Sequence, residues 1–110
     1  MTTYLVMVLS NPVEGREAEF DEWYERIHLD EVMATAGFSS AQRFKLEAAR
    51  GAASAHDYLA LYETEADSAE EVIERLNGSR SARQQSGSIN SRDAALWVFA
   101  PTGERHVIAG

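Results

Sequence analysis

The chain contains no cysteine. Disulfides, thiolate zinc sites and thiol nucleophiles are therefore excluded, and the absence of thiols favours the cytoplasm. Basic residues are also scarce, because ten Lys and Arg stand against eighteen Asp and Glu, for a formal net charge of −8. A field of this sign repels the phosphates of nucleic acids and anionic membrane surfaces. We therefore expect neither nucleic acid nor a membrane as a partner.

Long hydrophobic runs are missing as well. The first apolar run, at residues 4–9, follows no basic segment and is too short for a signal-peptide core or a membrane span. The 110 residues are enough for one domain and too few for two hydrophobic cores. With 45% hydrophobic and 25% charged residues, the composition is that of a globular protein. We expect one cytoplasmic domain spanning residues 1–110.

Four apolar runs predict strands, and two segments with helical periodicity predict helices. The strands are expected at residues 4–9, 38–46, 58–62 and 94–100, and the helices at 14–34 and 68–78. Ser68 and Glu71 have the spacing of a capping box, which marks a helix start. This order predicts an α+β fold of the ferredoxin-like β-α-β-β-α-β kind, with a four-stranded antiparallel sheet and two helices on one face.

Three of the expected strands are apolar on both of their faces. In residues 4–9, 58–62 and 94–100, both alternating sets of side chains are apolar. Only one set can face the helices, so the other set forms an apolar patch larger than a soluble monomer normally exposes. A symmetric second copy is the simplest cover for such a patch, and we expect a homodimer.

A set of residues along the chain resembles a known family. They are Asn11-Pro12-Val13-Glu14-Gly15-Arg16-Glu17, Phe20, Trp23-Tyr24, His28-Leu29, Glu31-Val32, Gly37-Phe38 and Ala41-Gln42-Arg43-Phe44. The pattern is similar to that of the EthD-like branch of the dimeric α+β barrel superfamily, in which aromatic-Tyr, His-Leu-Pro and Pro-Gly-Phe follow one another. Asp30 and Ala36 stand where that pattern has proline. We expect Asp30 to cap a second helical segment after a break at Leu29-Asp30.

The resemblance implies a homodimer whose two sheets pack face to face, with a pocket in each subunit between sheet and helices. The implied dimer agrees with the partner expected from the apolar faces. The superfamily includes cofactor-free monooxygenases, polyketide cyclases, lactone isomerases, aldoxime dehydratases and haem-dependent chlorite dismutases. The resemblance therefore constrains the fold more narrowly than the reaction.

His28 and Tyr24 are the candidate catalytic residues. One helical turn separates them, and imidazole is the side chain that exchanges protons most readily near neutral pH. The resemblance to the family's Tyr-x-x-x-His element points to the same pair. His28 would be the acid or base, and Tyr24 its partner or an oxyanion donor. The alternatives are a histidine that bonds the last helix carbonyls and a tyrosine that only packs in the core.

The candidate substrate-binding residues are aromatic, apart from one amide. Trp23, Phe44 and Trp97 would wall an apolar pocket, where Gln42 would orient a ligand. Tyr62 would bring a hydroxyl to the pocket or to the dimer interface. The structural alternatives are core packing for the aromatic residues and backbone pairing for Gln42.

The charged residues near these candidates have expected partners. Gln42 and Arg43 alternate along a strand and so lie on opposite faces. We expect Arg43 to pair with Asp57 or Glu63 on a neighbouring strand. The expected helix break turns Glu31 to solvent. In an unbroken helix Glu31 would instead lie on the apolar side, as a second acid or base candidate.

We expect no metal and no cofactor. His28, His56 and His106 are isolated in the sequence, and no thiolate accompanies them. A haem held by one histidine stays open as an alternative. The features together favour a small cofactor-independent enzyme, an isomerase, cyclase or lyase, that acts by proton transfer on a hydrophobic carbonyl or phenolic metabolite. A cofactor-free monooxygenase of an electron-rich aromatic and a non-catalytic small-molecule binding protein are the alternatives.

Overall fold

The structure is a computed structural model that describes residues 1–109. Its elements follow the chain as β1 (Thr2–Ser10), α1 (Glu17–Trp23), η1 (Tyr24–His28), α2 (Leu29–Ala36), β2 (Ser40–Lys45), β3 (Tyr58–Ala66), α3 (Ala69–Ser79), η2 (Arg80–Ala82) and β4 (Ala95–Phe99). The strands form one sheet in the order β2-β3-β1-β4, with every neighbouring pair antiparallel. The predicted ferredoxin-like α+β fold is thereby confirmed.

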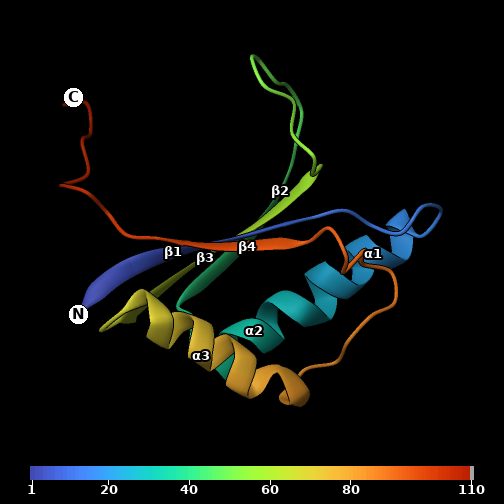
Figure 1. Ribbon diagram of the computed structural model, residues 1–110, viewed down its shortest axis with the longest axis horizontal. Helices are drawn as coiled ribbons and strands as arrows, with labels where there is room; N and C mark the ends of the chain where they lie inside the picture. Colours follow the sequence, from blue (N-terminus) through green and yellow to red (C-terminus); the bar gives the residue numbers. More distant parts are fainter. Residues whose placement is uncertain (110) are drawn as a thin grey trace.

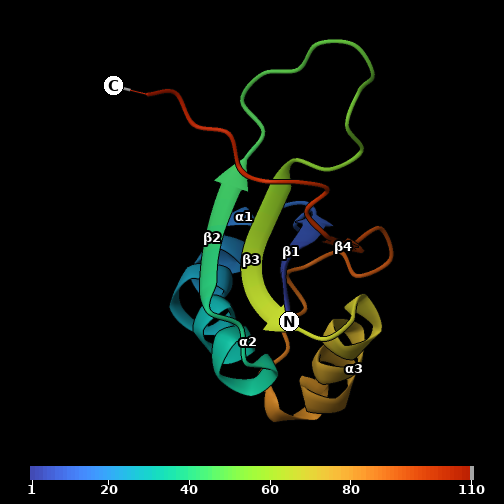
Figure 2. The ribbon, with the colours of Figure 1, turned by 90° about the vertical axis from the view of Figure 1, so that its left-hand side faces the viewer.

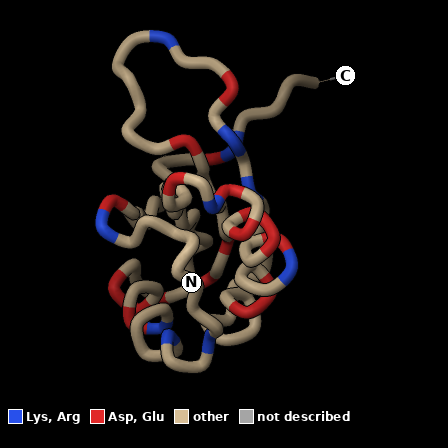
Figure 3. The backbone as a smooth tube through the Cα atoms, turned by 90° about the vertical axis from the view of Figure 1, so that its right-hand side faces the viewer, with Lys and Arg blue, Asp and Glu red and all other residues tan. Residues whose placement is uncertain are grey.

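The helices lie on one side of the sheet, as Figure 1 shows. Loop 46–57 and the segment that follows β4 extend away from the helices, and Figure 2 shows the same arrangement from the side. No helix in the described part of the chain is long and apolar enough to cross a membrane. Acidic residues are spread over the helices and loops, with basic residues among them (Figure 3).

The hydrophobic core lies between the helices and what we call the covered face of the sheet. Alternate residues of β1 and β3 point into it, and nearly all of them are buried: Tyr4, Val6 and Ser10 from β1, and Ala60, Tyr62, Thr64 and Ala66 from β3. The helices contribute Phe20, Trp23, Tyr24, Leu29, Val32, Ala36, Val72 and Leu76 to the same core. Strand alternation turns every second residue of β1 and β3 toward the helices, and the helical period turns one side of each helix toward the sheet.

The opposite side of the sheet, the open face, has no protein layer over it in the described residues. The strand register aligns Gln42, Leu61, Met7 and Trp97 in one row across the sheet. The next row holds Phe44, Leu59, Leu9 and Ala95. Large apolar side chains stay exposed here, with Trp97 at 50% and Phe99 at 46%. The sequence prediction that the strands are apolar on both faces is therefore confirmed.

The first helix does not break at Leu29-Asp30, and that prediction is wrong. The chain instead widens into a π-helical turn at Tyr24–His28 and continues as α2. The N–H of Leu29 donates to the Tyr24 carbonyl oxygen, and His28 at the start of α2 has helical backbone angles. Because the backbone ladder is not interrupted, Asp30 has no free helix end to cap.

The ends of the two helices follow the sequence signals more closely. Gly37 ends α2 in the left-handed conformation at φ 74°, where glycine carries no side-chain penalty. Ser68 accepts a hydrogen bond from the Glu71 N–H at 3.1 Å, and the Glu71 carboxylate accepts one from the Asp67 N–H at 2.8 Å. The predicted N-cap contact of Ser68 is confirmed, whereas the Glu71 carboxylate bonds the N–H of Asp67 and not that of Ser68. Helix α3 then runs to Ser79, and η2 leads the chain to Arg83.

Candidate functional site

Four of the predicted site residues lie in the core between the first helix and the sheet. Trp23, Tyr24 and Tyr62 are buried there, and His28 is half-buried at the edge of this core. The His28 ring stacks on Trp23, with 4.1 Å between ring centroids and 23° between the planes. A second aromatic contact is with the edge of Tyr24, at 5.0 Å between centroids. The imidazole therefore contacts two aromatic rings.

The π-helical turn explains the stack of His28 on Trp23. In an α-helix, residues five positions apart lie about 140° apart around the axis. The hydrogen bonds of a π-helix join residues i and i+5, and so bring these two positions to the same side. Trp23 and His28 are five residues apart and flank this turn. An α-helix would have kept them apart.

His28 is half-buried and uncharged at neutral pH. Burial, followed by the positive charge of Arg83, lowers the pKa of His28 from 6.5 to about 4. Its Nδ1 atom is buried and has no hydrogen-bond partner among the described residues. With the ring proton on Nε2, Nδ1 presents a free lone pair at neutral pH, because the imidazole is uncharged there.

Two tyrosine hydroxyls accompany the imidazole. Burial raises the pKa of Tyr24, while its hydrogen bond with Ser10 and the charge of Arg43 act in the opposite direction. Burial also raises the pKa of Tyr62, and the neighbouring Tyr24 adds to that shift. Both phenols are therefore neutral at pH 7 and can donate hydrogen bonds to a bound oxygen.

Arg83 is a member of this cluster that the sequence did not single out. Its Nη1 donates to Thr35 Oγ1 at 3.0 Å and to Ser79 Oγ at 2.6 Å, and its Nη2 donates to the Leu76 carbonyl at 3.0 Å. Its Nε is buried without a partner among the described residues. The residue lies in a connector that has no hydrophobic period, so the sequence gives no sign that its charge acts on the pKa of His28.

Arg43 does not pair with Asp57 or Glu63, and that prediction is wrong. Its guanidinium pairs with Asp21 at 2.8 Å and Glu25 at 3.2 Å, both on the first helix. The reason is the strand register, which puts Arg43 opposite Ala60 on the covered face while Glu63 lies on the open face. The guanidinium also lies 4.8 Å from the centre of the Tyr24 ring, at cation–π distance.

Glu31 does not turn to solvent, because the helix is not broken there. Its side chain is half-buried and accepts a hydrogen bond from the Gln84 N–H at 2.8 Å. The indole Nε1 of Trp23 donates to the Gln84 carbonyl at 3.1 Å. Gln84 is therefore held against the first helix by both of its backbone polar groups.

A hollow of about 420 Å³ lies on the outer side of this contact. Trp23, Ile27 and Gln84 form part of its wall, together with Arg16, Glu19, Glu22, Arg26, Gln85, Ser86 and Gly87. Trp23 thus contacts both the hollow and the imidazole of His28. The volume is in the range of small-molecule sites in proteins.

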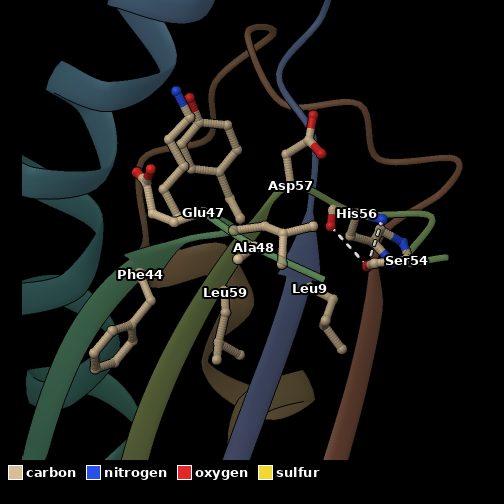
Figure 4. A pocket seen from close by; sticks show the side chains of 11 residues that line it. Leu9, Phe44, Glu47, Ala48, Ser54, His56, Asp57 and Leu59 are labelled. Atoms are coloured by element: carbon tan, nitrogen blue, oxygen red, sulfur yellow. Dashed lines mark hydrogen bonds between the residues drawn. The ribbon is translucent and has the colours of Figure 1, made fainter. Parts of the chain in front are cut away.

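The remaining predicted site residues lie on the open face, away from His28. Gln42 and Trp97 belong to one row of the sheet, and Phe44 belongs to the next. Phe44 lines a second hollow of about 420 Å³ with Leu9 and Leu59, beside loop 46–57. Figure 4 shows these three side chains on neighbouring strands, with Ser54 and His56 of loop 46–57 beside them. The predicted site residues therefore lie on two opposite sides of the sheet, the helix side and the open face.

No metal site is evident in residues 1–109, where no three His, Asp or Glu side chains are grouped so that they could hold an ion. The imidazole of His28 and the phenol of Tyr24, whose rings are in contact, are groups that donate, accept and transfer protons. Comparison of the chain with family models, curated proteins and solved structures gives no match.

Proposed function

We propose that this chain is an enzyme that transfers a proton on a hydrophobic carbonyl or phenolic metabolite. The observation that carries the proposal is the uncharged imidazole of His28, which stacks on Trp23, contacts the edge of Tyr24 and has a buried Nδ1 without a partner among the described residues. A buried neutral imidazole beside neutral phenols is a combination suited to general acid–base chemistry. The EthD-like resemblance supports the same pair of residues.

The proposed chemistry uses only side chains of the chain itself. His28 Nδ1 removes a proton from the carbon next to a carbonyl, and the electron pair moves onto the carbonyl oxygen. A phenol donates a hydrogen bond to that oxygen and stabilises the enolate. Return of the proton to a different carbon is an isomerisation, and attack of the enolate on a second carbonyl is a cyclisation. The growing negative charge raises the pKa of His28 during the transfer.

The substrate body is proposed to occupy the hollow beside Trp23, Ile27 and Gln84. This hollow adjoins the imidazole through the Trp23 ring, and it is large enough for one or two fused rings. Release of the hydrogen bond between Trp23 and the Gln84 carbonyl would open the way to His28. We assign Gln42, Phe44 and Trp97 to a different role, because they lie across the sheet.

We infer that these residues belong to a homodimer interface on the open face. Four neighbouring strands present apolar side chains there, and Leu5, Phe44, Trp97 and Phe99 are each more than a third exposed. A patch of this kind marks an interaction surface in soluble proteins. A second copy offers the same apolar surface and can pair with it about a two-fold axis. The absence of cysteine supports a cytoplasmic location for this dimer.

Proton exchange on a model ketone tests the proposed activity. 1-Indanone is hydrophobic and carries exchangeable hydrogens next to its carbonyl, so their loss in D₂O is followed by proton NMR. We expect the wild type to accelerate the exchange, and His28→Gln to lower the accelerated rate by about 10²- to 10⁴-fold. His106→Gln, in an exposed part of the chain, is the matched control and keeps the wild-type rate.

Two outcomes of this experiment contradict the proposal. One is a His28→Gln protein that exchanges 1-indanone as fast as the wild type. The other is a wild type that gives the rate of buffer alone. Oxygen consumption is recorded in the same samples, because uptake coupled to turnover would indicate the monooxygenase alternative.

A further inference from the structure

The segment that follows β4 carries apolar side chains that its own chain does not cover. We call residues 100–109 the β4 extension, and all of them are exposed. Figure 1 shows that the extension runs away from the helices, on the same side of the sheet as loop 46–57. Val107 is 75% exposed and Ile108 97%. Removal of two such side chains from water is favourable, so the extension has an apolar pair suited to binding another surface.

The hollow beside loop 46–57, which we call the open-face hollow, offers such a surface. Its floor consists of Leu9, Phe44 and Leu59 on neighbouring strands (Figure 4), and Leu46 and Ala48 of the loop line it as well. Its volume of about 420 Å³ has room for two aliphatic side chains. Neighbouring residues of an extended segment point to opposite sides, so one of them would contact the floor and the next the loop.

The β4 extension and the open-face hollow lie at opposite ends of the sheet. Strand β4 ends at Phe99, which lies opposite Leu5 of β1. The hollow contains Leu9, about 13 Å further along β1 at the rise of a strand. No residue of the extension lines the hollow of its own chain. The two features can therefore meet most directly between two copies.

A two-fold axis that runs across the strands brings them together. Rotation about this axis places the Leu5 end of one open face over the Leu9 end of the other. Each extension then leaves its sheet beside the hollow of the other copy, and the two contacts are identical. An axis along the strands would instead place the two loops 46–57 against each other. Because these loops project from the open face (Figure 1), they would hold the two sheets apart.

The charges around the hollow also fit the extension. Glu47 and Asp57 line the hollow, and neither forms a salt bridge among residues 1–109. Lys45 is the third charged residue of this wall, which leaves one negative charge in excess. In an extended segment, Arg105 lies on the same side as Val107 and about 7 Å away. With Val107 in the hollow, the guanidinium of Arg105 therefore reaches the acidic rim.

We propose that residues 104–109 of each copy bind in the open-face hollow of the other copy, with Val107 and Ile108 against its floor and loop. This inference rests on the homodimer inferred above, and it adds a reciprocal exchange of segments to that dimer. The exchange removes the apolar pair of one copy and Phe44 in the hollow of the other from water in the same contact.

Disulfide trapping tests the exchange, because the chain has no cysteine of its own. Ala48→Cys places a thiol in the wall of the hollow, and Ile108→Cys places one in the extension. The two single variants are mixed, refolded together and oxidised. We expect a covalent dimer that contains one chain of each variant, identified by its mass. Either variant alone should give none, because the exchange brings residue 48 of one copy to residue 108 of the other.

Glu70→Cys is the matched control for the position in the hollow. Glu70 is exposed on α3, on the helix side of the sheet (Figure 1). A mixture of Glu70→Cys and Ile108→Cys has the same number of thiols and no contact that holds them together. We expect it to give only the background of covalent dimer that random collision produces.

Sedimentation equilibrium provides a second measurement that does not depend on thiols. The double variant Val107→Ser/Ile108→Ser removes the apolar pair from both copies. We expect the Kd of the dimer to rise about 10²- to 10⁴-fold. Thr102→Ala, earlier in the same extension, should keep the wild-type Kd. All three positions are exposed, so the fold of the domain is retained, which circular dichroism verifies.

The outcomes separate the exchange from the proposals on which it rests. A mixture of Ala48→Cys and Ile108→Cys that gives no more covalent dimer than the Glu70→Cys control overturns the exchange. An unchanged Kd in Val107→Ser/Ile108→Ser does the same. If either result comes with a wild type of dimer mass, the homodimer stands without the exchange, whereas a wild type of monomer mass removes both. Proton exchange on 1-indanone tests the proposed activity independently of all these results.

Discussion

The two faces of the sheet are built from the same kinds of residue and have opposite surroundings. On the covered face, Val6 and Tyr62 are almost completely buried against the helices. Their neighbours along the strands, Leu5 and Leu61, point to the open face, and Leu5 is 38% exposed there. Helix packing within one chain therefore accounts for one set of apolar residues only.

The polar residues sharpen this contrast. The covered face contains buried hydroxyls on Ser10, Thr64 and Tyr62, and the proposed site lies among them. In the two central rows of the open face, Gln42 is the one polar side chain. The face that is closed within one chain thus carries the groups suited to chemistry, whereas the open face carries those suited to association.

The largest expected effect is the loss of a core ring from the covered face. Phe20 is completely buried and packs edge-on against Tyr24 at 5.2 Å. We expect Phe20→Ala to lower the free energy of unfolding by about 3–5 kcal/mol, as measured by urea denaturation. Phe44→Ala, on the open face, should cost about 1 kcal/mol or less in dilute samples, because Phe44 is 42% exposed. Equal losses for the two variants would mean that the faces do not differ as described.

The second-largest expected effect is on the Kd of the inferred dimer, and it comes from a substitution at the centre of the open face. Leu61 lies between Gln42 and Met7 in the sheet, so Leu61→Lys places a charge in the middle of the inferred interface. At about 2 kcal/mol per buried charge and two copies per dimer, the Kd of the dimer should rise about 10³-fold. Sedimentation equilibrium measures this change, and Glu65→Lys near the end of the same strand is the control.

This second experiment also tests the inferred dimer itself. A wild type that sediments with the mass of one chain at all concentrations would remove the dimer from the proposal. A Leu61→Lys protein that keeps both the dimer mass and the wild-type Kd would move the interface to another surface. Circular dichroism shows whether the variant retains its fold.

The third-largest expected effect is a pH dependence of the free energy of unfolding, and it comes from His28 on the helix side of the sheet. The unfolded chain protonates His28 near pH 6.5, whereas the folded chain does so only near pH 4. Between these values the unfolded state binds more protons, so the free energy of unfolding decreases as the pH falls. The contribution of His28 is complete above about pH 6.5 and is lost toward pH 4, a change of about 3 kcal/mol.

Urea denaturation at several pH values isolates this contribution. The difference in unfolding free energy between pH 7 and pH 4 should be smaller in His28→Gln than in the wild type, by about the 3 kcal/mol assigned to His28. His106→Gln should keep the wild-type difference. A His28→Gln protein with an unchanged pH dependence would show that the imidazole is not buried as a neutral group.

Much of the fold was accessible from the sequence, because strand and helix signals agree with the topology. The two-faced apolar pattern of β1, β3 and β4 predicted the open face, and Ser68 with Glu71 predicted the start of α3. What the pattern could not supply was the side on which each apolar set lies. Both alternating sets are apolar, so periodicity does not tell which one meets the helices.

The candidate site was predictable only where its geometry is local. Tyr24 and His28 are four residues apart on one helix, and the structure brings their rings together. The stack of His28 on Trp23 depends on a π-helical turn, for which helical periodicity gives no signal. Arg83 reaches the site through a connector without periodicity, so its place depends on how α3 packs.

The smallest expected effects concern two polar side chains of the helices that pack on the covered face, Ser68 and Asp30. Ser68 accepts the Glu71 N–H at the start of α3, whereas Asp30 lies in an unbroken helix and caps nothing. We expect Ser68→Ala to lower the free energy of unfolding by about 1 kcal/mol, and Asp30→Ala to change it by less than about 0.5 kcal/mol. Urea denaturation at pH 7 measures both. A loss of 1 kcal/mol or more in Asp30→Ala would indicate that the first helix does end and restart at Leu29-Asp30, and that the π-helical turn does not hold His28 against Trp23.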